Sequence, residues 1–126
     1  MRTAAELADA SMRAAVTGDR EAWLALYADD AVLEDPVGPS IWDAQGKGHR
    51  GKQALVAFWD LAIGPNRSLE FELRERYTGG NEVANVLTVR SALPDGQKIE
   101  LRMVTILRSN AAGLIQSLRA FWNSAA

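Results

Sequence analysis

The amino-acid sequence predicts an α+β fold in which helices come first and a sheet follows. Good helix formers dominate the opening residues, and apolar residues recur there at helical spacing. Beyond Pro65 the period changes to two, because Leu69, Phe71 and Leu73 alternate with charged residues. A sheet of this kind curls around helices gathered on one face. We therefore expect a cone-shaped roll of three N-terminal helices packed on a curved, mostly antiparallel sheet that encloses a pocket.

The first two helices are expected before residue 31. A run of helix formers over 4–16 ends at Gly18, and Asp19 is a suitable N-cap for a second, short helix. We expect this second helix to end at Asp29 and Asp30. Its buried side would carry Trp23, Leu26 and Tyr27.

A brief strand over 31–35 follows, and it ends at Pro36, which lacks the backbone donor that a ladder needs. This places Asp35 at a strand end. Residues 37–51 predict a long loop, because glycine, proline and polar residues gather there. Loops of this length are often functional lids, and Trp42 is the lid candidate.

The remaining elements are a third helix and four strands. The helix is expected over 52–62, with Leu55, Phe58 and Trp59 on one face. The first strand contains the alternating residues after Pro65. Three more are expected over 83–93, 98–107 and 114–122, joined by turns that contain Gly96 and Gly113.

Length, charge and composition limit the classes of function. The 126 residues suit one domain, so we expect a single domain over 1–126. A formal charge of −2 gives no electrostatic footprint for nucleic acid. We see no apolar stretch long enough for a signal peptide or a membrane span, and the absence of cysteine fits a reducing compartment. We expect a cytoplasmic protein with no nucleic-acid or membrane partner.

Several motifs together resemble one known family. They are LYADDA at 26–31 followed by EDPVG at 34–38, GHRG at 48–51 leading into AFW at 57–59, and NAAG at 110–113 with LRAFW at 118–122. By these motifs the sequence resembles the ketosteroid isomerase family, within the SnoaL-like and nuclear-transport-factor-like superfamily, and most of all its actinobacterial members. The match covers nearly the whole chain, and the fold it implies is also described as cystatin-like.

The resemblance implies a catalytic role for Asp35. In the family, the matching aspartate removes a proton from the carbon next to a steroid ketone and returns it two carbons further along, with no cofactor. The ligand would be a small hydrophobic molecule, a steroid-like ketone. The resemblance also implies a homodimer formed through the outer face of the sheet, where we expect Val86, Ile99 and Ile106.

Two positions depart from the family pattern. Ser11 stands where the family has an oxyanion-hole tyrosine, and Thr105 stands where it has a protonated aspartate. Neither side chain is an equivalent donor, and each donor lost at a developing oxyanion typically slows a reaction a hundredfold to a thousandfold. Ser11 is also consistent with core packing, its hydroxyl bonded back to helix carbonyls.

Further residues are candidates for contact with a ligand. Asn85 lies on an apolar strand face, so its amide either has a partner in the core or faces a ligand. The aromatic residues are consistent both with core packing and with cavity lining. The predicted substrate-binding set is Ser11, Tyr27, Trp42, Phe58, Trp59, Asn85, Leu87, Met103, Thr105 and Trp122.

These observations leave three functions open. An isomerase would use Asp35 as acid and base, whereas a non-catalytic binder of steroid-like or polyketide-like ligands would need only the cavity. A hydrolase or cyclase would need a second acid, and no second carboxylate is evident in the pocket-facing set. A metal site is not expected, since His49 has no partner at metal-ligand spacing.

Overall fold

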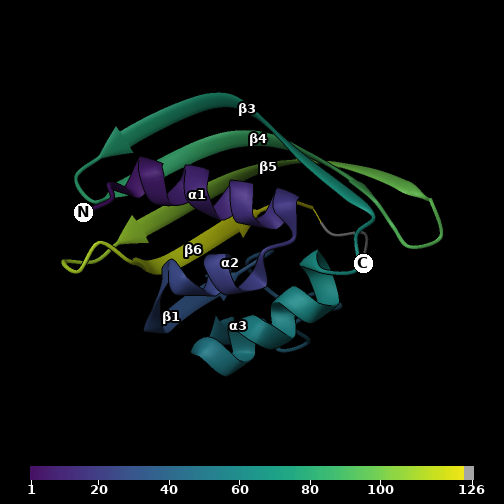
Figure 1. Cartoon of the computed structure of the whole chain (residues 1–126), viewed down its shortest axis with the longest axis horizontal. Coiled ribbons are helices and arrows are strands. Elements are labelled where there is room, and N and C mark those ends of the chain that lie inside the picture. The colour runs from purple at the N-terminus through teal and green to yellow at the C-terminus, as the bar shows by residue number, and fades with distance from the viewer. Residues whose placement is uncertain (124–126) are drawn as a thin grey trace.

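A six-stranded sheet curls around the first helix of the chain (Figure 1). The computed structural model describes residues 1–123. The strand order is β2-β1-β6-β5-β4-β3, in which β1 pairs with β6 in parallel and all other neighbours are antiparallel. The strands are β1 (Tyr27–Glu34), β2 (His49–Arg50), β3 (Ser68–Gly79), β4 (Glu82–Ala92), β5 (Lys98–Ser109) and β6 (Ile115–Phe121).

The predicted N-terminal helix is confirmed as α1 (Ala4–Thr17). Thr3 and Glu6 form a capping box at its start, and Gly18 ends it in the left-handed conformation. In Figure 1, α1 lies across the concave side of the sheet. It therefore forms one wall of the space between the helices and the strands.

The second helix, α2 (Arg20–Ala25), begins after the predicted cap, Asp19. The prediction that it reaches Asp29 and Asp30 is wrong, because both residues lie in β1. The physical reason is tertiary: the Ile115 backbone N–H donates to the Leu26 carbonyl oxygen at 2.8 Å, and β6 draws the chain into the sheet from Tyr27 onward.

The predicted third helix is present as α3 (Lys52–Phe58), followed by a π-helical turn, η1 (Trp59–Ile63). The predicted loop over 37–51 is wrong at its end, since His49 and Arg50 form β2. This short strand pairs with Val32 and Leu33 of β1. The remainder of the loop has no strand, but Ser40 and Asp43 form an isolated antiparallel bridge within it.

The strands of the second half form where the sequence predicts them, with one irregularity. Leu73 pairs with Leu87, but Glu75 pairs with Val86, so Arg74 is an extra residue in β3. Such a bulge exchanges the two faces of the strand beyond it. Arg76 therefore lies opposite Asn85, on the inner face of the sheet.

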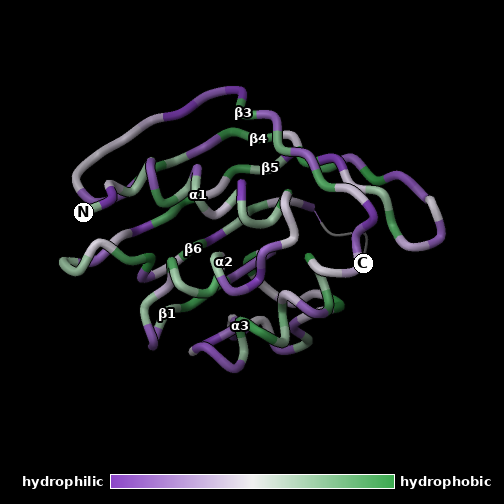
Figure 2. The backbone as a smooth tube through the Cα atoms, viewed as in Figure 1, coloured by the Kyte–Doolittle hydropathy of each residue, from purple (hydrophilic) through white to green (hydrophobic). Residues whose placement is uncertain are grey.

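Hydropathy follows the layers of the fold. In Figure 2, hydrophobic and hydrophilic segments alternate along the long strands, as expected for a sheet with one buried face. The core contains Leu7, Leu33, Leu55, Leu107 and Ile115, each at most 1% exposed. Among residues 1–123, none of the helices has both the length and the apolar character needed to cross a bilayer.

We predict that Leu7→Ala lowers the free energy of unfolding by about 2–5 kcal/mol, because it leaves a cavity between α1 and the sheet. Urea denaturation measures this change. Val16→Ala is the matched control on the same helix: Val16 is 50% exposed, and its loss should change stability by less than about 0.5 kcal/mol. Equal effects of the two substitutions would contradict the assigned packing of α1.

Candidate active site

A cavity of about 330 Å³ lies between α1 and the inner face of the sheet. Its volume falls in the range of sites for small organic ligands. Apolar side chains from α1, β3, β4, β5 and β6 supply most of its lining, together with the segment after α3. The few polar groups that reach it therefore determine which chemistry the cavity supports.

Asp35 supplies the carboxylate of this cavity. Asp35 comes directly after Glu34, the last residue of β1. Its Oδ1 atom accepts a hydrogen bond of 2.6 Å from the indole nitrogen of Trp122. Although the residue retains some exposed surface, protein atoms enclose its carboxylate. Burial raises the pKa of Asp35 to about 6, and the hydrogen bond from Trp122 partly opposes this rise.

The parallel pairing of β1 with β6 brings these two side chains together. Leu33 lies opposite Leu118 and Glu34 opposite Arg119, so Asp35 reaches the level of Ala120. The Val37 backbone N–H donates to the Ala120 carbonyl oxygen at 2.8 Å and extends this alignment past the strand. Glu34 points to the other side, where it forms an ion pair with Arg119 at 3.0 Å.

Three aromatic rings surround the carboxylate end of the cavity. The Trp42 ring contacts the rings of Phe58 and Trp122 in edge-on geometry, with centroids 5.8 Å and 6.0 Å apart. All three rings line the cavity. Trp42, the predicted lid residue, is half-buried and is the part of the 37–51 loop that reaches the interior.

Ser11 and Tyr27 lie on the helical side of the cavity. Ser11 is buried, as core packing requires, and it also lines the cavity, but its hydroxyl makes no hydrogen bond to a helix carbonyl within residues 1–123. The Tyr27 phenol oxygen is buried and also has no hydrogen-bond partner in that part of the chain. Burial raises the pKa of Tyr27, the neighbouring Ser11 side chain opposes this rise, and the charge of Asp35 makes a smaller contribution that adds to it.

Strands β4 and β5 contribute four of the predicted residues to the lining. Asn85 and Leu87 lie on β4, and Met103 and Thr105 lie opposite Leu87 and Asn85, respectively, on β5. Asn85 and Thr105 are buried polar residues. They are neighbours on a mostly apolar inner face.

Three residues have positions that the sequence did not predict. Trp59, predicted to contact ligand, is not part of the lining and packs behind Trp23, with ring centroids 5.2 Å apart. Trp23 is part of the lining instead. Ile99, predicted on the outer face, lines the cavity because it shares the strand parity of Met103. Strand alternation alone could have placed Ile99 correctly.

His49 lies near the cavity but outside its lining. Its ring packs on Phe58 with centroids 4.9 Å apart, and its Nε2 atom is buried without a hydrogen-bond partner in the part of the chain that the structure describes. Burial lowers the pKa of His49. In residues 1–123, no three histidine or acidic side chains are grouped so that they could hold a metal ion.

The fold and the enclosed carboxylate define a class of protein. Residues 8–118 match the SnoaL-like domain family, and the chain belongs to this family. Its fold is the ketosteroid isomerase-like cone that the sequence resemblance implies. That resemblance is thereby confirmed.

Particular relatives narrow the comparison. A steroid Delta-isomerase from Nocardioides simplex is 32% identical over 105 residues, which cover 83% of this chain and 77% of that protein. A Delta 5-3-ketosteroid isomerase structure from Mycobacterium sp. is 40% identical, with a TM-score of 0.91 and coverage of 98% of this chain and 95% of that chain. These relatives make the chain a steroid Delta-isomerase-like protein.

Two further solved structures of this fold are relevant to ligands. A Mycobacterium tuberculosis protein in complex with estradiol-17beta-hemisuccinate is 39% identical, with a TM-score of 0.91 and coverage of 98% of this chain and 95% of that chain. A computationally designed 17-OHP binder is 38% identical, with a TM-score of 0.92 and the same two coverages. Both of those proteins are described with a steroid-like ligand.

We predict that Trp122→Phe raises the pKa of Asp35 above about 6 by roughly one to two units, because the ionised carboxylate loses its hydrogen-bond donor. A titration of the carboxyl carbon by NMR measures this shift without any need for activity. Trp42→Phe is the control, since Trp42 contacts the Trp122 ring but donates no hydrogen bond to Asp35. An unchanged titration in Trp122→Phe would contradict the assigned donor.

Proposed function

We propose that this protein moves the double bond of a β,γ-unsaturated ketosteroid into conjugation with the ketone, with Asp35 as the proton carrier. The supporting observation is the Asp35 carboxylate itself, which is enclosed at the edge of an apolar cavity and has a pKa raised to about 6. Such a group is ionised at neutral pH and yet more basic than an ordinary aspartate. Both properties suit a general base.

The proposed reaction consists of two proton transfers. The ionised Asp35 removes a proton from the carbon between the ketone and the alkene, which leaves a dienolate and a neutral carboxylic acid. The acid then returns the same proton to the far carbon of the former alkene. Atoms and electrons balance within the substrate, so no oxidant, reductant or cofactor is required.

Stabilisation of the dienolate oxygen limits the expected rate. Ser11 and Thr105 stand at the positions of the family's two hydrogen-bond donors. Their side chains are shorter than those donors, and their hydroxyl groups are less acidic than a phenol or a carboxylic acid. Loss of two such donors typically costs a hundredfold to a thousandfold each. We therefore propose a slow isomerase rather than one limited by diffusion.

The second candidate is a non-catalytic binder of steroid-like or polyketide-like molecules. It is favoured by the scarcity of donors in the lining and by the likeness to a designed 17-OHP binder. Cavity size and apolar character support either function. Only a measurement of double-bond migration distinguishes the two.

We predict that Asp35→Asn lowers turnover of a β,γ-unsaturated ketosteroid by about 10²–10⁴-fold, because the general base is lost while the cavity keeps its shape. Ultraviolet absorbance of the conjugated enone measures turnover, and calorimetry measures retained binding. Glu34→Gln is the control, because Glu34 is the adjacent carboxylate and pairs with Arg119 on the other side.

The two outcomes of this experiment have different meanings. Full turnover in Asp35→Asn would exclude Asp35 as the base. Steroid binding by the unaltered protein without any change in absorbance would exclude the isomerase and support the binder.

We also predict that kcat/KM for the isomerisation falls as the pH drops below about 6 and stays level above it. The raised pKa of Asp35 means that the carboxyl becomes protonated as the pH falls through about 6, and a protonated acid is not a base. Initial rates between pH 4 and pH 8 measure this profile. A rate that stays constant down to pH 4 would contradict the enclosure of the carboxylate.

The homodimer and the cytoplasmic location also belong to this proposal. On the outer face, Val86 lies opposite Val104, which in turn lies opposite Phe121, and the last two are each 39% exposed. An apolar row of this kind supports association between two copies of the chain.

A further inference from the structure

One amide stands out on the apolar inner face of the sheet. Asn85 is 2% exposed, lines the cavity and has the apolar neighbours Val83 and Leu87 two residues away on each side. It lies opposite Thr105, which lies opposite Ala120. These residues form one row across β4, β5 and β6. The row ends beside the segment that follows Asp35, because Val37 donates to the Ala120 carbonyl oxygen.

Arg76 determines which way this amide points. The bulge at Arg74 turns Arg76 to the inner face, where its Nε atom donates to the Asn85 Oδ1 atom at 2.8 Å. A guanidinium group only donates hydrogen bonds, so the amide oxygen must face it. The amide nitrogen therefore points away from Arg76.

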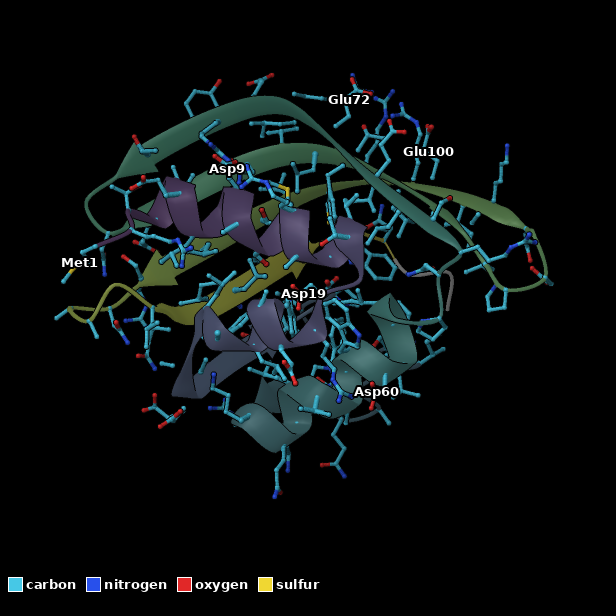
Figure 3. All side chains as sticks on the ribbon, in the orientation of Figure 1. Met1, Asp9, Asp19, Asp60, Glu72 and Glu100 are labelled. Carbon is cyan, nitrogen blue, oxygen red and sulfur yellow. The ribbon has the colours of Figure 1, made fainter. Side chains whose placement is uncertain are left out.

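Asp9 holds the guanidinium in place from α1. Its two carboxylate oxygens accept hydrogen bonds of 2.7 Å and 3.2 Å from the terminal nitrogens of Arg76. Figure 3 shows Asp9 on the side of α1 that faces β3. A paired, two-point contact of this kind fixes the plane of the guanidinium. The helix, the bulged strand and the amide are thus joined in one chain of hydrogen bonds.

The amide NH₂ group is the unused end of this chain. Within residues 1–123 it has no hydrogen-bond partner, yet it is not sealed off by protein atoms. Because the residue as a whole is almost fully buried, the remaining access is from the cavity. A donor that is unpaired in an apolar space gains free energy when an acceptor arrives.

The Tyr27 phenol is a less accessible donor than the Asn85 amide. The Tyr27 phenol oxygen has almost no exposed surface, so a ligand does not reach it without movement of the side chains around it. Thr105 has a shorter side chain than its neighbour Asn85. Among these three groups, the Asn85 amide offers a donor in a fixed direction toward the cavity.

We propose that Asn85 donates a hydrogen bond to the ketone oxygen of the ligand, and that Arg76 and Asp9 orient its amide for this purpose. The proposal rests on the proposed function only in that the ligand is a polycyclic ketone bound in this cavity. Asn85 lies two strand spacings, about 10 Å, from Ala120, which is level with Asp35. One small ring system of the ligand therefore carries both the ketone oxygen bound by Asn85 and the carbon next to Asp35. Asn85 is the specificity determinant, and Arg76 is a positioning residue.

The test compares two steroids that differ only in whether the ring carries a ketone or a methylene group. Calorimetry should show that the unaltered protein binds the ketone about tenfold more tightly. In Asn85→Leu this preference should disappear, so that the two steroids bind about equally, with the affinity for the methylene analogue retained. In Arg76→Met the preference should fall at least threefold, because the amide is no longer oriented.

Arg90→Met is the matched control. Arg90 also pairs with carboxylates, namely those of Glu70, Glu72 and Glu100, but it is not itself part of the cavity lining. Glu72 and Glu100 lie on the outer side of the sheet (Figure 3). This substitution removes one positive charge and should leave the ketone preference unchanged. A purely structural role of Arg76 would instead lower the affinity for both steroids equally.

The outcomes separate this proposal from the proposed function. A full ketone preference in Asn85→Leu would overturn the role of Asn85, even if Asp35→Asn shows the expected loss of turnover. Loss of preference in Asn85→Leu with no isomerisation by the unaltered protein would support the donor and overturn the isomerase. If the unaltered protein bound neither steroid, the ligand class and both proposals would be wrong.

Discussion

The parallel pairing of β1 with β6 is the constraint on which the candidate site depends. It aligns the end of β1 with the last residues of β6, so Asp35 and Trp122 meet although 87 positions separate them in the chain. The antiparallel strands beyond β6 then curl around α1 and supply the rest of the cavity wall (Figure 1). Without this alignment, the same aspartate would end a surface strand and have no reason to differ from an ordinary carboxylate.

Enclosure has two opposite consequences for the chemistry. Desolvation disfavours the charged carboxylate and so raises its pKa into a range useful for proton transfer. The same apolar surroundings offer few donors for a negative charge that develops on a substrate oxygen. Stabilisation of that charge therefore depends on a few hydrogen-bond donors at the substrate oxygen. This chain lacks the two donors that the family resemblance implies at positions 11 and 105.

The bulge in β3 brings other polar groups to the inner face of the sheet. One extra residue at Arg74 reverses the faces of the following residues, and Arg76 reaches the inner side as a result. There it is neutralised by Asp9 and bonded to Asn85. A buried amide without such an anchor could present either its oxygen or its nitrogen to a ligand, whereas an anchored amide presents only its nitrogen.

Local periodicity, caps and prolines act over a few residues, so they were enough to predict the helices, most strand positions and the position of Asp35 at a strand end. The family was predicted from the resemblance of several motifs along the chain. The sequence also indicated Asn85 as a polar residue on an apolar face. The tertiary structure alone decided the early start of β1, the exclusion of Trp59 from the cavity and the inward turn of Arg76. These features depend on pairing between distant strands and on a single-residue bulge, and neither has a periodic signal in the chain.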